Sequence, residues 1–501
     1  MKTIVQILGF LGKSVNIKNL ENVQINHIYQ DHRLCDSHDL FIALSGHTTD
    51  GHRYVQQAQQ KPVAFIIVEN MDKINTDILH HRIIEISDIR EKLAELANWF
   101  YDYPSNKATI FAVTGTNGKA STSHFIAQIL TKIHHKTAVM GTLGNGIYPN
   151  TKPSSHTTLD VLALQSHLAT YCNNGVKNIV MEASSHAIDQ NRIAGIGINT
   201  AVFTHLSSDH LDYHGNMENY FKVKSRLFDH PGLKCAVINQ DDDYGRRLCK
   251  KLRGQQGLNL YCYSIKDENS DCFMAIKNIE INAIEVTIFW QKTHIGEVKL
   301  PVIGMFNVSN IAAAITACIA EGYAVQKIMP ILSMLSSVPG RMESISMPRR
   351  PTVIIDYAHN ADALEKLLKS IQPSAKNKII CVFGCGGNRG TEKRPLMAKA
   401  VEKYADFCIV TEDNNRNEPF SDIAMGVVAG FSKSYKDFTV IANREQAIKQ
   451  ALDYADMGDI VVLAGKGHER YLDHQGYREY FNEREIVEKY WRSSPRSKLL
   501  S

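Results

Sequence analysis

The segment from Thr114 to Lys119, TGTNGK, constrains the fold of this chain more than any other feature. It follows the apolar run 109–113 and precedes a helix-like stretch, 121–133. A strand, a glycine-bearing loop that ends in lysine and a helix form a unit that holds nucleotide phosphates, because backbone N–H groups and the helix N-terminus face the anion. The lysine of such a unit reaches the β- and γ-phosphates. The sequence therefore predicts an ATP-binding α/β domain whose contacts include Gly115, Thr116, Asn117, Gly118, Lys119 and Ser121.

The residue that follows the lysine of this loop departs from the usual pattern. A serine or threonine usually stands there and ligates Mg²⁺, whereas this chain has Ala120, with Ser121 one position later. Losing one hydroxyl ligand weakens metal binding or slows turnover, unless Ser121 or water replaces it. A weakly active or non-catalytic nucleotide-binding protein therefore stays open as an alternative.

The order of apolar runs divides the 501 residues into three blocks, because a chain of this length is too long for one ordinary core. The first block, 1–105, mixes short strands with a helix. The second, 106–335, has strand-like runs such as 178–182 between helical patterns, which is typical of a parallel sheet with crossover helices, and its run 273–302 indicates antiparallel strands. The third, 336–501, alternates strands and helices, with Gly, Asp, His and Arg at the strand ends. The predicted fold class is α/β in three domains, with a central parallel-sheet phosphate-loop domain and a Rossmann-like C-terminal domain.

Composition narrows the classes of partner and location. The net charge is only +4 and the basic residues are scattered, which disfavours nucleic acid as a partner. The 10 cysteines form no paired C-x-x-C knuckles, which indicates buried thiols in a reducing compartment. No apolar run approaches the length of a membrane span. We therefore expect a cytoplasmic protein without a membrane span. We also expect a monomer, although the composition does not bear on oligomeric state.

Two further segments carry polar residues next to the expected phosphate site. Glu182 ends the strand-like run 178–182, where a carboxylate can hold Mg²⁺ beside phosphates or simply accept a hydrogen bond from a loop. His205, His210 and His214 lie within ten residues, and Lys224 follows them. Zinc ligation and a solvated lysine are the alternatives, but the absence of a nearby cysteine favours a Mg²⁺-bearing phosphate cleft.

From about Asp31 to about Glu469, these motifs in this order resemble the Mur ligase family, the ATP-dependent amide-forming enzymes of peptidoglycan precursor synthesis. The nearest branch adds the third residue of the stem peptide to UDP-N-acetylmuramoyl-L-alanyl-D-glutamate through an acyl phosphate. The resemblance implies an ADP-forming ligase with a UDP-sugar domain (1–105), a central ATPase domain (106–335) and a C-terminal domain for the incoming amino acid (336–501).

The resemblance also implies roles for residues around ATP. Lys119 would bind phosphates, and Glu182 and His210 would ligate magnesium, with two Mg²⁺ ions expected. Lys224 falls where the family carries a carbamylated lysine (N6-carboxylysine), an anion able to bind Mg²⁺. The further ATP contacts implied are Asn307, Arg341, Asp356 and His359.

Substrate contacts follow from the same resemblance. For the UDP-N-acetylmuramoyl-dipeptide they are Asp31, Arg33, His47, Thr157, Thr158, Ser184, Gln190 and Arg192. For meso-diaminopimelate they are Arg389, Asp413, Asn414, Asn415, Arg416, Gly465 and Glu469. The segment 413–416 resembles the Asp-Asn-Pro-Arg motif of diaminopimelate-adding members. Diaminopimelate has an extra amino acid head, whose carboxylate suits Arg416 and whose ammonium suits Glu469. A surface salt bridge is the alternative role for Arg416.

Departures from the family pattern leave other functions open. Ala120 replaces a threonine, and Asn415 replaces a proline and so loosens the loop before Arg416. A paralogue with another amino acid or acyl substrate could tolerate both changes. A signalling or transport ATPase would explain the phosphate loop alone, and Thr157-Thr158 with 413–416 argue against a folylpolyglutamate-type ligase. Because the phosphate, metal and arginine positions are retained, we favour the diaminopimelate-adding activity.

Overall fold

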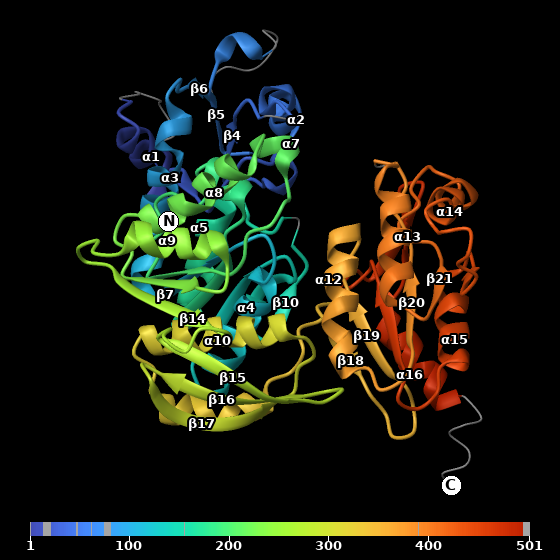
Figure 1. Ribbon diagram of the computed structural model, residues 1–501. Coiled ribbons are helices and arrows are strands. Elements are labelled where there is room, and N and C mark those ends of the chain that lie inside the picture. Colours follow the sequence, from blue (N-terminus) through green and yellow to red (C-terminus); the bar gives the residue numbers. More distant parts are fainter. Residues whose placement is uncertain are drawn as a thin grey trace. The chain divides into compact units, whose positions relative to one another are not determined.

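The computed structural model describes residues 2–13, 22–46, 49–61, 63–74, 82–154, 156–388 and 390–493 (Figure 1). It contains parallel sheets with connecting helices, as the sequence predicts. The chain divides into two compact units, residues 1–261 and residues 262–501. The three-domain boundaries at 105 and 335 stay predictions. Within the described ranges, no helix is both long enough and apolar enough to cross a membrane.

The first unit begins with a four-stranded parallel sheet in the order β3-β4-β5-β6. Alternate residues of one strand face opposite sides. Leu40 and Ile42 pack with α1 and α3, whereas Phe41 and Ala43 pack with α2, so helices cover both faces. The elements are β3 (His27–Tyr29), β4 (Asp39–Ala43), β5 (Phe65–Val68), β6 (Ile83–Glu85), α1 (Ile4–Phe10), α2 (Val55–Gln60) and α3 (Ile89–Phe100). A short antiparallel pair, β1 (Lys2–Thr3) and β2 (Gln24–Ile25), flanks α1 in the chain.

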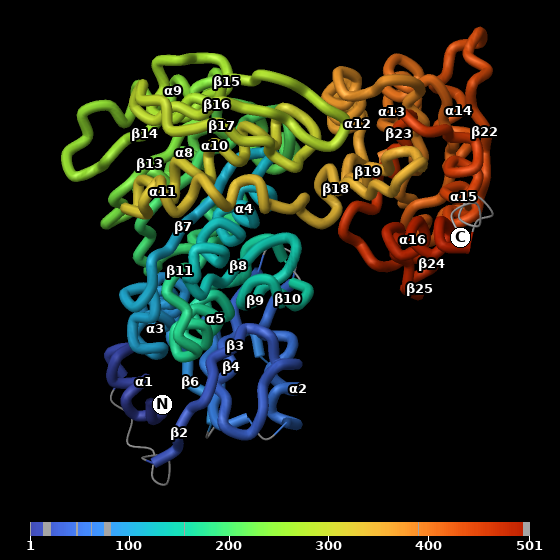
Figure 2. The backbone as a smooth tube through the Cα atoms, turned by 90° about the horizontal axis from the view of Figure 1, so that it is seen from below, coloured from blue at the N-terminus to red at the C-terminus, as the bar shows by residue number. Residues whose placement is uncertain are grey.

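The central sheet of this unit has the order β10-β9-β8-β11-β7-β12-β13, with β8, β11, β7, β12 and β13 parallel. Its strands are β7 (Thr109–Thr114), β8 (Thr137–Gly141), β9 (Gly144–Ile147), β10 (Asn150–Lys152), β11 (Asn178–Glu182), β12 (Thr200–Phe203) and β13 (Cys235–Asn239). Its helices are α4 (Lys119–Lys132), α5 (Val161–Asn173), α6 (Ser185–Asp189), α7 (Leu211–His214), α8 (Met217–Ser225) and α9 (Asp243–Leu252). Figure 2 shows β8, β9 and β10 following one another at one edge of this sheet. Because Glu182 pairs with Val113 and Phe203 with Thr114, three strand ends meet at the phosphate loop.

The second unit starts with the antiparallel strands that the run 273–302 predicts. They are β15 (Cys272–Ile279), β16 (Ile284–Trp290) and β17 (Thr293–Leu300). Strand β14 (Asn259–Ser264), which begins before residue 262, runs parallel to β15 through Tyr263 and Ser264. The helices α10 (Met305–Ala320) and α11 (Val325–Ile328) follow. Helix α10 is apolar on most of its surface and packs on β15, which explains why it is almost wholly buried.

The C-terminal sheet has the order β18-β19-β23-β20-β21-β22 and is parallel except for β18. Its strands are β18 (Glu343–Ile345), β19 (Thr352–Asp356), β20 (Ile379–Phe383), β21 (Phe407–Val410), β22 (Phe438–Val440) and β23 (Ile460–Ala464). Helices α12 (Ala361–Ile371), α13 (Lys393–Tyr404) and α14 (Phe420–Val428) pack in one core with Cys381 and Val462. Helices α15 (Arg444–Tyr454) and α16 (Glu483–Ser493) pack in the other with Val382 and Leu463. Helices thus cover both faces of the sheet, as in a doubly wound fold, and a hairpin, β24 (Tyr471–His474) and β25 (Tyr477–Tyr480), follows β23.

Candidate active site

The phosphate loop lies between the end of β7 and the start of α4, as the sequence predicts. Gly115 and Gly118 have φ angles of 150° and 87°, which L side chains rarely adopt. A Cβ atom at Gly115 would overlap the Thr204 hydroxyl, which donates to the Asn117 carbonyl at 2.6 Å. Within the described chain, no side chain caps the start of α4. The helix N-terminus therefore offers its backbone donors to an anion.

Two lysines converge on this loop. Lys119 Nζ donates to the Gly115 and Thr116 carbonyls at 3.0 Å each, and Lys224 Nζ donates to the Gly115 carbonyl at 2.9 Å. Lys224 is only 1% exposed. Burial and the neighbouring Lys119 charge hold the pKa of Lys224 well below its usual range, while Asp209 acts in the opposite direction. The loop thus combines positive charge with a lysine that favours its neutral amine form.

An aromatic cluster connects Lys224 to His210. The Tyr220 ring lies 4.8 Å from Lys224 Nζ and 6.5 Å from the His210 ring. Tyr220 also binds the Thr116 hydroxyl of the phosphate loop at 3.2 Å. His210 has a left-handed φ of 51°, and half of its side chain is exposed. The structure therefore gathers Lys119, Lys224 and His210 around one loop.

The Glu182 carboxylate is buried at the end of β11 and held by a residue that the sequence analysis did not identify. One oxygen accepts the Thr142 N–H at 2.7 Å, and the other accepts the Thr142 hydroxyl at 3.2 Å. The Thr142 hydroxyl lies 3.1 Å from that of Thr157. Thr142 stands just after β8 and outside any quoted motif, so only its place at a strand end could have signalled it.

Five residues predicted for the UDP-sugar substrate form a network beside Glu182. The Thr158 hydroxyl donates to the Glu182 carbonyl at 2.7 Å and accepts the Ser184 N–H at 3.1 Å. Arg192 donates to the Thr158 carbonyl at 3.1 Å and to Gln190 Oε1 at 2.6 Å. With Thr157 bound to Thr142, these groups place hydroxyl and guanidinium donors at the carboxyl end of β11.

The other residues predicted for the UDP-sugar substrate are Asp31, Arg33 and His47. The Asp31 carboxylate accepts two N–H groups of Arg33, at 2.9 and 2.7 Å, and Arg33 is largely exposed. The structure thus pairs these two residues with each other. His47 lies outside the described residues.

The sequence predicts metal ligation by Glu182 and His210. Among the described side chains, no group of three or more His, Cys, Asp or Glu residues is arranged to hold a metal ion. The predicted magnesium set contains only two such residues, Glu182 and His210, so its third member, Lys224, would supply oxygen ligands only as a carbamate.

In the second unit, three of the residues predicted for ATP surround Tyr357. The Arg341 guanidinium lies 4.9 Å from the Tyr357 ring, and the His359 ring lies 4.8 Å from it. Asp356, at the end of β19, accepts the Met342 N–H at 2.8 Å, and burial raises its pKa although the Arg341 charge opposes this.

The loop before Arg341 touches the loop after β23. A Cβ atom at Gly340 would overlap the backbone of Gly467 and His468, so the two loops are in direct backbone contact. Asn307, the fourth predicted ATP contact, binds the Ile303 carbonyl at 2.9 Å near the start of α10.

The residues predicted for the incoming amino acid meet at the carboxyl ends of β21 and β23. Asn414 Nδ2 donates to Glu469 Oε2 at 2.9 Å, and a Cβ atom at Gly465 would lie 2.9 Å from Asp413. Arg416 has a left-handed φ of 53° and donates to the Gly387 carbonyl at 2.7 Å. These contacts join Asn414 to Glu469 and bring Gly465 close to Asp413, whereas the Arg416 side chain contacts the loop after β20.

Asn415 and Arg389 are the remaining members of the predicted amino-acid set. Asn415 is buried and lies 3.4 Å from Glu412 through its side-chain nitrogen. Arg389 lies outside the described residues. Lys466, which the sequence analysis did not single out, is fully buried among Asp413, Asn414 and Glu469.

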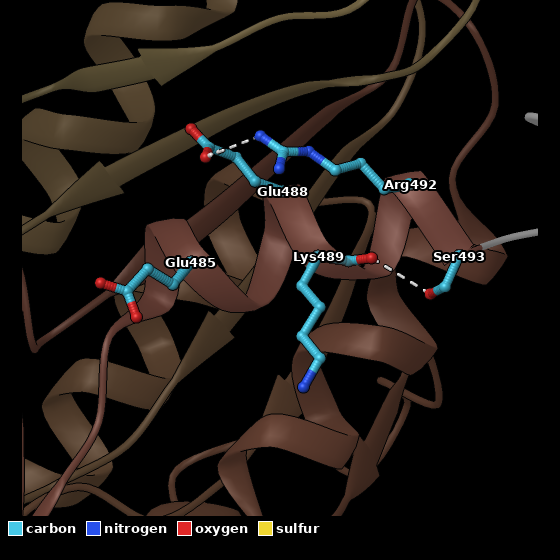
Figure 3. Close-up of a pocket in the computed structure, with 5 residues that line it drawn as sticks. All are labelled: Glu485, Glu488, Lys489, Arg492 and Ser493. Carbon is cyan, nitrogen blue, oxygen red and sulfur yellow. Dashed lines mark hydrogen bonds and ion pairs between the residues drawn. The ribbon is translucent and has the colours of Figure 1, made fainter.

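A separate surface hollow lies along α16 and is lined by Glu485, Glu488, Lys489, Arg492 and Ser493 (Figure 3). Glu488 pairs with Arg492 at 3.9 Å, and the Ser493 hydroxyl donates to the Lys489 carbonyl at 3.1 Å. All five residues come from one helix and several bind one another, so this hollow offers no convergent set of groups for chemistry.

Comparison with known proteins gives a consistent result along the chain. Residues 24–101 match the description "Mur ligase family, catalytic domain", residues 113–318 "Mur ligase middle domain" and residues 340–467 "Mur ligase, glutamate ligase domain". The UDP-N-acetylmuramoyl-L-alanyl-D-glutamate–2,6-diaminopimelate ligase of Pseudomonas aeruginosa is 39% identical over 451 residues, covering 90% of this chain and 92% of that protein. The ligase of the same name from Coxiella burnetii is 40% identical over 471 residues, covering 92% and 95%.

Solved structures agree with this result. The structure of a UDP-N-acetylmuramoyl-L-alanyl-D-glutamate–2,6-diaminopimelate ligase matches with a TM-score of 0.70 at 32% identity and covers 98% of this chain and 99% of that chain. The similarity therefore extends over both units and is not confined to the phosphate loop.

Burial of His468 generates a prediction about pH. The His468 ring lies 5.0 Å from that of Tyr357, and burial, helped by the Arg341 charge, lowers its pKa to about 4. Between pH 6.5 and 4, the unfolded chain binds a proton that the folded chain does not, so stability falls as the pH falls through this window. We expect His468→Asn to reduce the acid-induced loss of unfolding free energy by about 2 kcal/mol, because the variant has no imidazole to protonate. Thermal unfolding of the wild type and His468→Asn at pH 7, 5.5 and 4.5 tests this prediction. An equal loss of stability in the two proteins would contradict it.

Proposed function

Because the chain belongs to the Mur ligase family, we propose that it is the ATP-dependent ligase that joins meso-2,6-diaminopimelate to UDP-N-acetylmuramoyl-L-alanyl-D-glutamate in peptidoglycan precursor synthesis. The observation that carries the choice of amino acid is the gathering of Asp413, Asn414, Arg416 and Glu469 at one end of the C-terminal sheet. The reaction consumes ATP and takes place, we propose, in the cytoplasm, where nucleotides are available.

The chemistry has two steps. An oxygen of the D-glutamate γ-carboxylate attacks the γ-phosphorus of ATP, and the bond to the β,γ-bridging oxygen breaks to release ADP. The amine of the incoming amino acid then attacks the carbonyl carbon of the acyl phosphate, loses a proton and expels phosphate. Both reactants of the first step are anionic, so Lys119 and the amides at the start of α4 have the role of offsetting their repulsion.

Magnesium would supply further charge neutralisation on the phosphates. Its proposed ligands are Glu182, His210 and Lys224 as a carbamate. The pKa of Lys224 is well below its usual range, which favours the neutral amine that can add carbon dioxide. The carbamate would also place an anion beside the Lys119 ammonium, since both lysines reach the Gly115 carbonyl.

The UDP-N-acetylmuramoyl-dipeptide is proposed to bind through Thr157, Thr158, Ser184, Gln190 and Arg192, with Asp31, Arg33 and His47 on the nucleotide side. The network beside Glu182 supports this proposal, because Thr157 and Thr158 lie next to Glu182, a proposed metal ligand. Arg341, Asp356, His359 and Asn307 are proposed ATP contacts.

The distal head of diaminopimelate is proposed to pair its carboxylate with Arg416 and its ammonium with Glu469. Arg416 is fixed through both side chain and backbone, since its N–H donates to the Asp473 carbonyl at 2.9 Å. L-Lysine has no distal carboxylate, so it would leave this guanidinium without an anion. The proposed site therefore favours diaminopimelate.

The deciding experiment measures ADP release and product with UDP-N-acetylmuramoyl-L-alanyl-D-glutamate and ATP, supplied with diaminopimelate, L-lysine or no amine. We expect product with diaminopimelate and at least about 100-fold less kcat/KM with L-lysine. Product with L-lysine alone would refute the role of Arg416. Binding of the nucleotide sugar without turnover would instead support the non-catalytic alternative that Ala120 raises.

Replacing Lys224 tests the carbamate. Lys224→Ala should lose roughly 100-fold or more of kcat, because the site loses an anionic oxygen ligand. Added acetate or formate should restore part of this activity by placing a carboxylate in the vacated space, whereas chloride at equal ionic strength should not. Lys222→Ala, which changes an exposed lysine of the same helix, is the matched control. Full activity of Lys224→Ala would remove the proposal.

Restoring a hydroxyl after Lys119 tests the irregular loop. Ala120 is buried at the start of α4. Ala120→Thr should lower the Mg²⁺ concentration for half-maximal rate by about tenfold, because it adds a ligand. Ala120→Val has the same shape without the hydroxyl and serves as the control. Equal Mg²⁺ dependence of all three proteins would show that Ser121 or water already replaces the missing group.

A further inference from the structure

Lys466 lies at the centre of the proposed amino-acid site and has no assigned role. Its side chain is 0% exposed. The ammonium donates to Asn414 Oδ1 at 2.9 Å and to Glu469 Oε2 at 2.7 Å, and it lies 3.6 Å from Asp413 Oδ1. It also lies 4.9 Å from the Tyr471 ring. A buried lysine needs such partners, because an unpaired charge is very costly in the protein interior.

This ammonium fixes the orientation of two groups in the proposed site. Asn414 Oδ1 accepts both Lys466 and the Asp473 N–H at 3.0 Å, so the amide nitrogen of Asn414 must point the other way. That nitrogen donates to Glu469 Oε2, the same oxygen that accepts Lys466. Among the described residues, Glu469 Oε1 has one hydrogen-bond partner, the more distant Tyr357 hydroxyl at 3.4 Å, and is therefore the oxygen better placed for a ligand ammonium.

Lys466 also contributes to the net charge of the proposed amino-acid site. Asp413 and Glu469 bring two negative charges, and Lys466 contacts both carboxylates. With Arg416, the charges of the four described side chains sum to zero. This matches a zwitterionic head, which carries one charge of each sign. Without Lys466 the sum would be −1, which suits an amine that lacks a carboxylate.

We propose that Lys466 is a specificity-determining positioning residue: it holds the Glu469 carboxylate and cancels one of two negative charges, so that the site selects a zwitterionic distal head over a purely cationic one. This inference rests on the proposed function. Lys466 acts through Glu469 and Asn414 and does not itself contact the substrate.

The test compares wild type and Lys466→Met with diaminopimelate and with L-lysine. Methionine keeps the apolar length of the chain and removes the charge. We expect the KM for diaminopimelate to rise about tenfold and the kcat/KM ratio of diaminopimelate to L-lysine to fall about tenfold. The KM values for ATP and the nucleotide sugar should stay within about twofold, since their proposed contacts are other residues. A purely structural role would not move the ratio of the two amines.

Arg478→Gln is the matched control. Its guanidinium lies 4.4 Å from the same Tyr471 ring but is exposed, so its loss should leave the ratio unchanged. An unchanged ratio in Lys466→Met overturns the inference while the proposed function stands. Failure of the wild type to join diaminopimelate would refute the proposed function instead, so the two outcomes are distinguishable.

Lys466→Met leaves Asp413 and Glu469 without their cation and could therefore fail to fold. A double variant then provides the test. Glu469→Gln combined with Lys466→Met removes one charge of each sign. If Lys466 acts through Glu469, the double variant should have a KM for diaminopimelate within about threefold of Glu469→Gln alone. A further tenfold loss would overturn the inference.

Discussion

The close approach of the phosphate loop to the end of β12 is the constraint on which the first unit depends. It requires a residue without Cβ at Gly115, because the Thr204 hydroxyl occupies that space. The Gly115 carbonyl can then accept both Lys119 and Lys224. Since β11 is the neighbour of β7, the same geometry places Glu182 and the Thr158 network alongside. The proposed nucleotide contacts and the proposed substrate contacts thus lie at adjacent strand ends of one sheet.

The same rule organises the second unit with other residues. The loops after β20, β21 and β23 supply Gly387, Arg416 and Lys466, which meet because these strands are neighbours in the sheet. Here the binding groups are held by a buried cation and by backbone carbonyls. Lys466 is fully buried, so its charge acts more strongly, and would be more costly if unpaired, than a charge at the surface.

Much of this arrangement could be predicted from sequence. The strands formed where apolar runs end in glycine or polar residues, and the segment 413–416 and Glu469 came together as the resemblance implied. Thr142 and Lys466 could not be identified, because nothing local distinguishes a buried threonine or lysine from a surface one. Their roles come from long-range pairing: Thr142 contacts a carboxylate 40 residues away, and Lys466 contacts an amide 52 residues away.

The backbone contact between Gly340 and the Gly467–His468 segment has a consequence for how this protein can evolve. Arg341 and Glu469 each stand one residue from that contact, yet one is proposed for nucleotide and the other for amino acid. Neither loop has space for a new side chain where they touch. A change of amino-acid specificity can therefore come from residues away from this contact, whereas a side chain added at Gly340 or Gly467 would require both loops to change together.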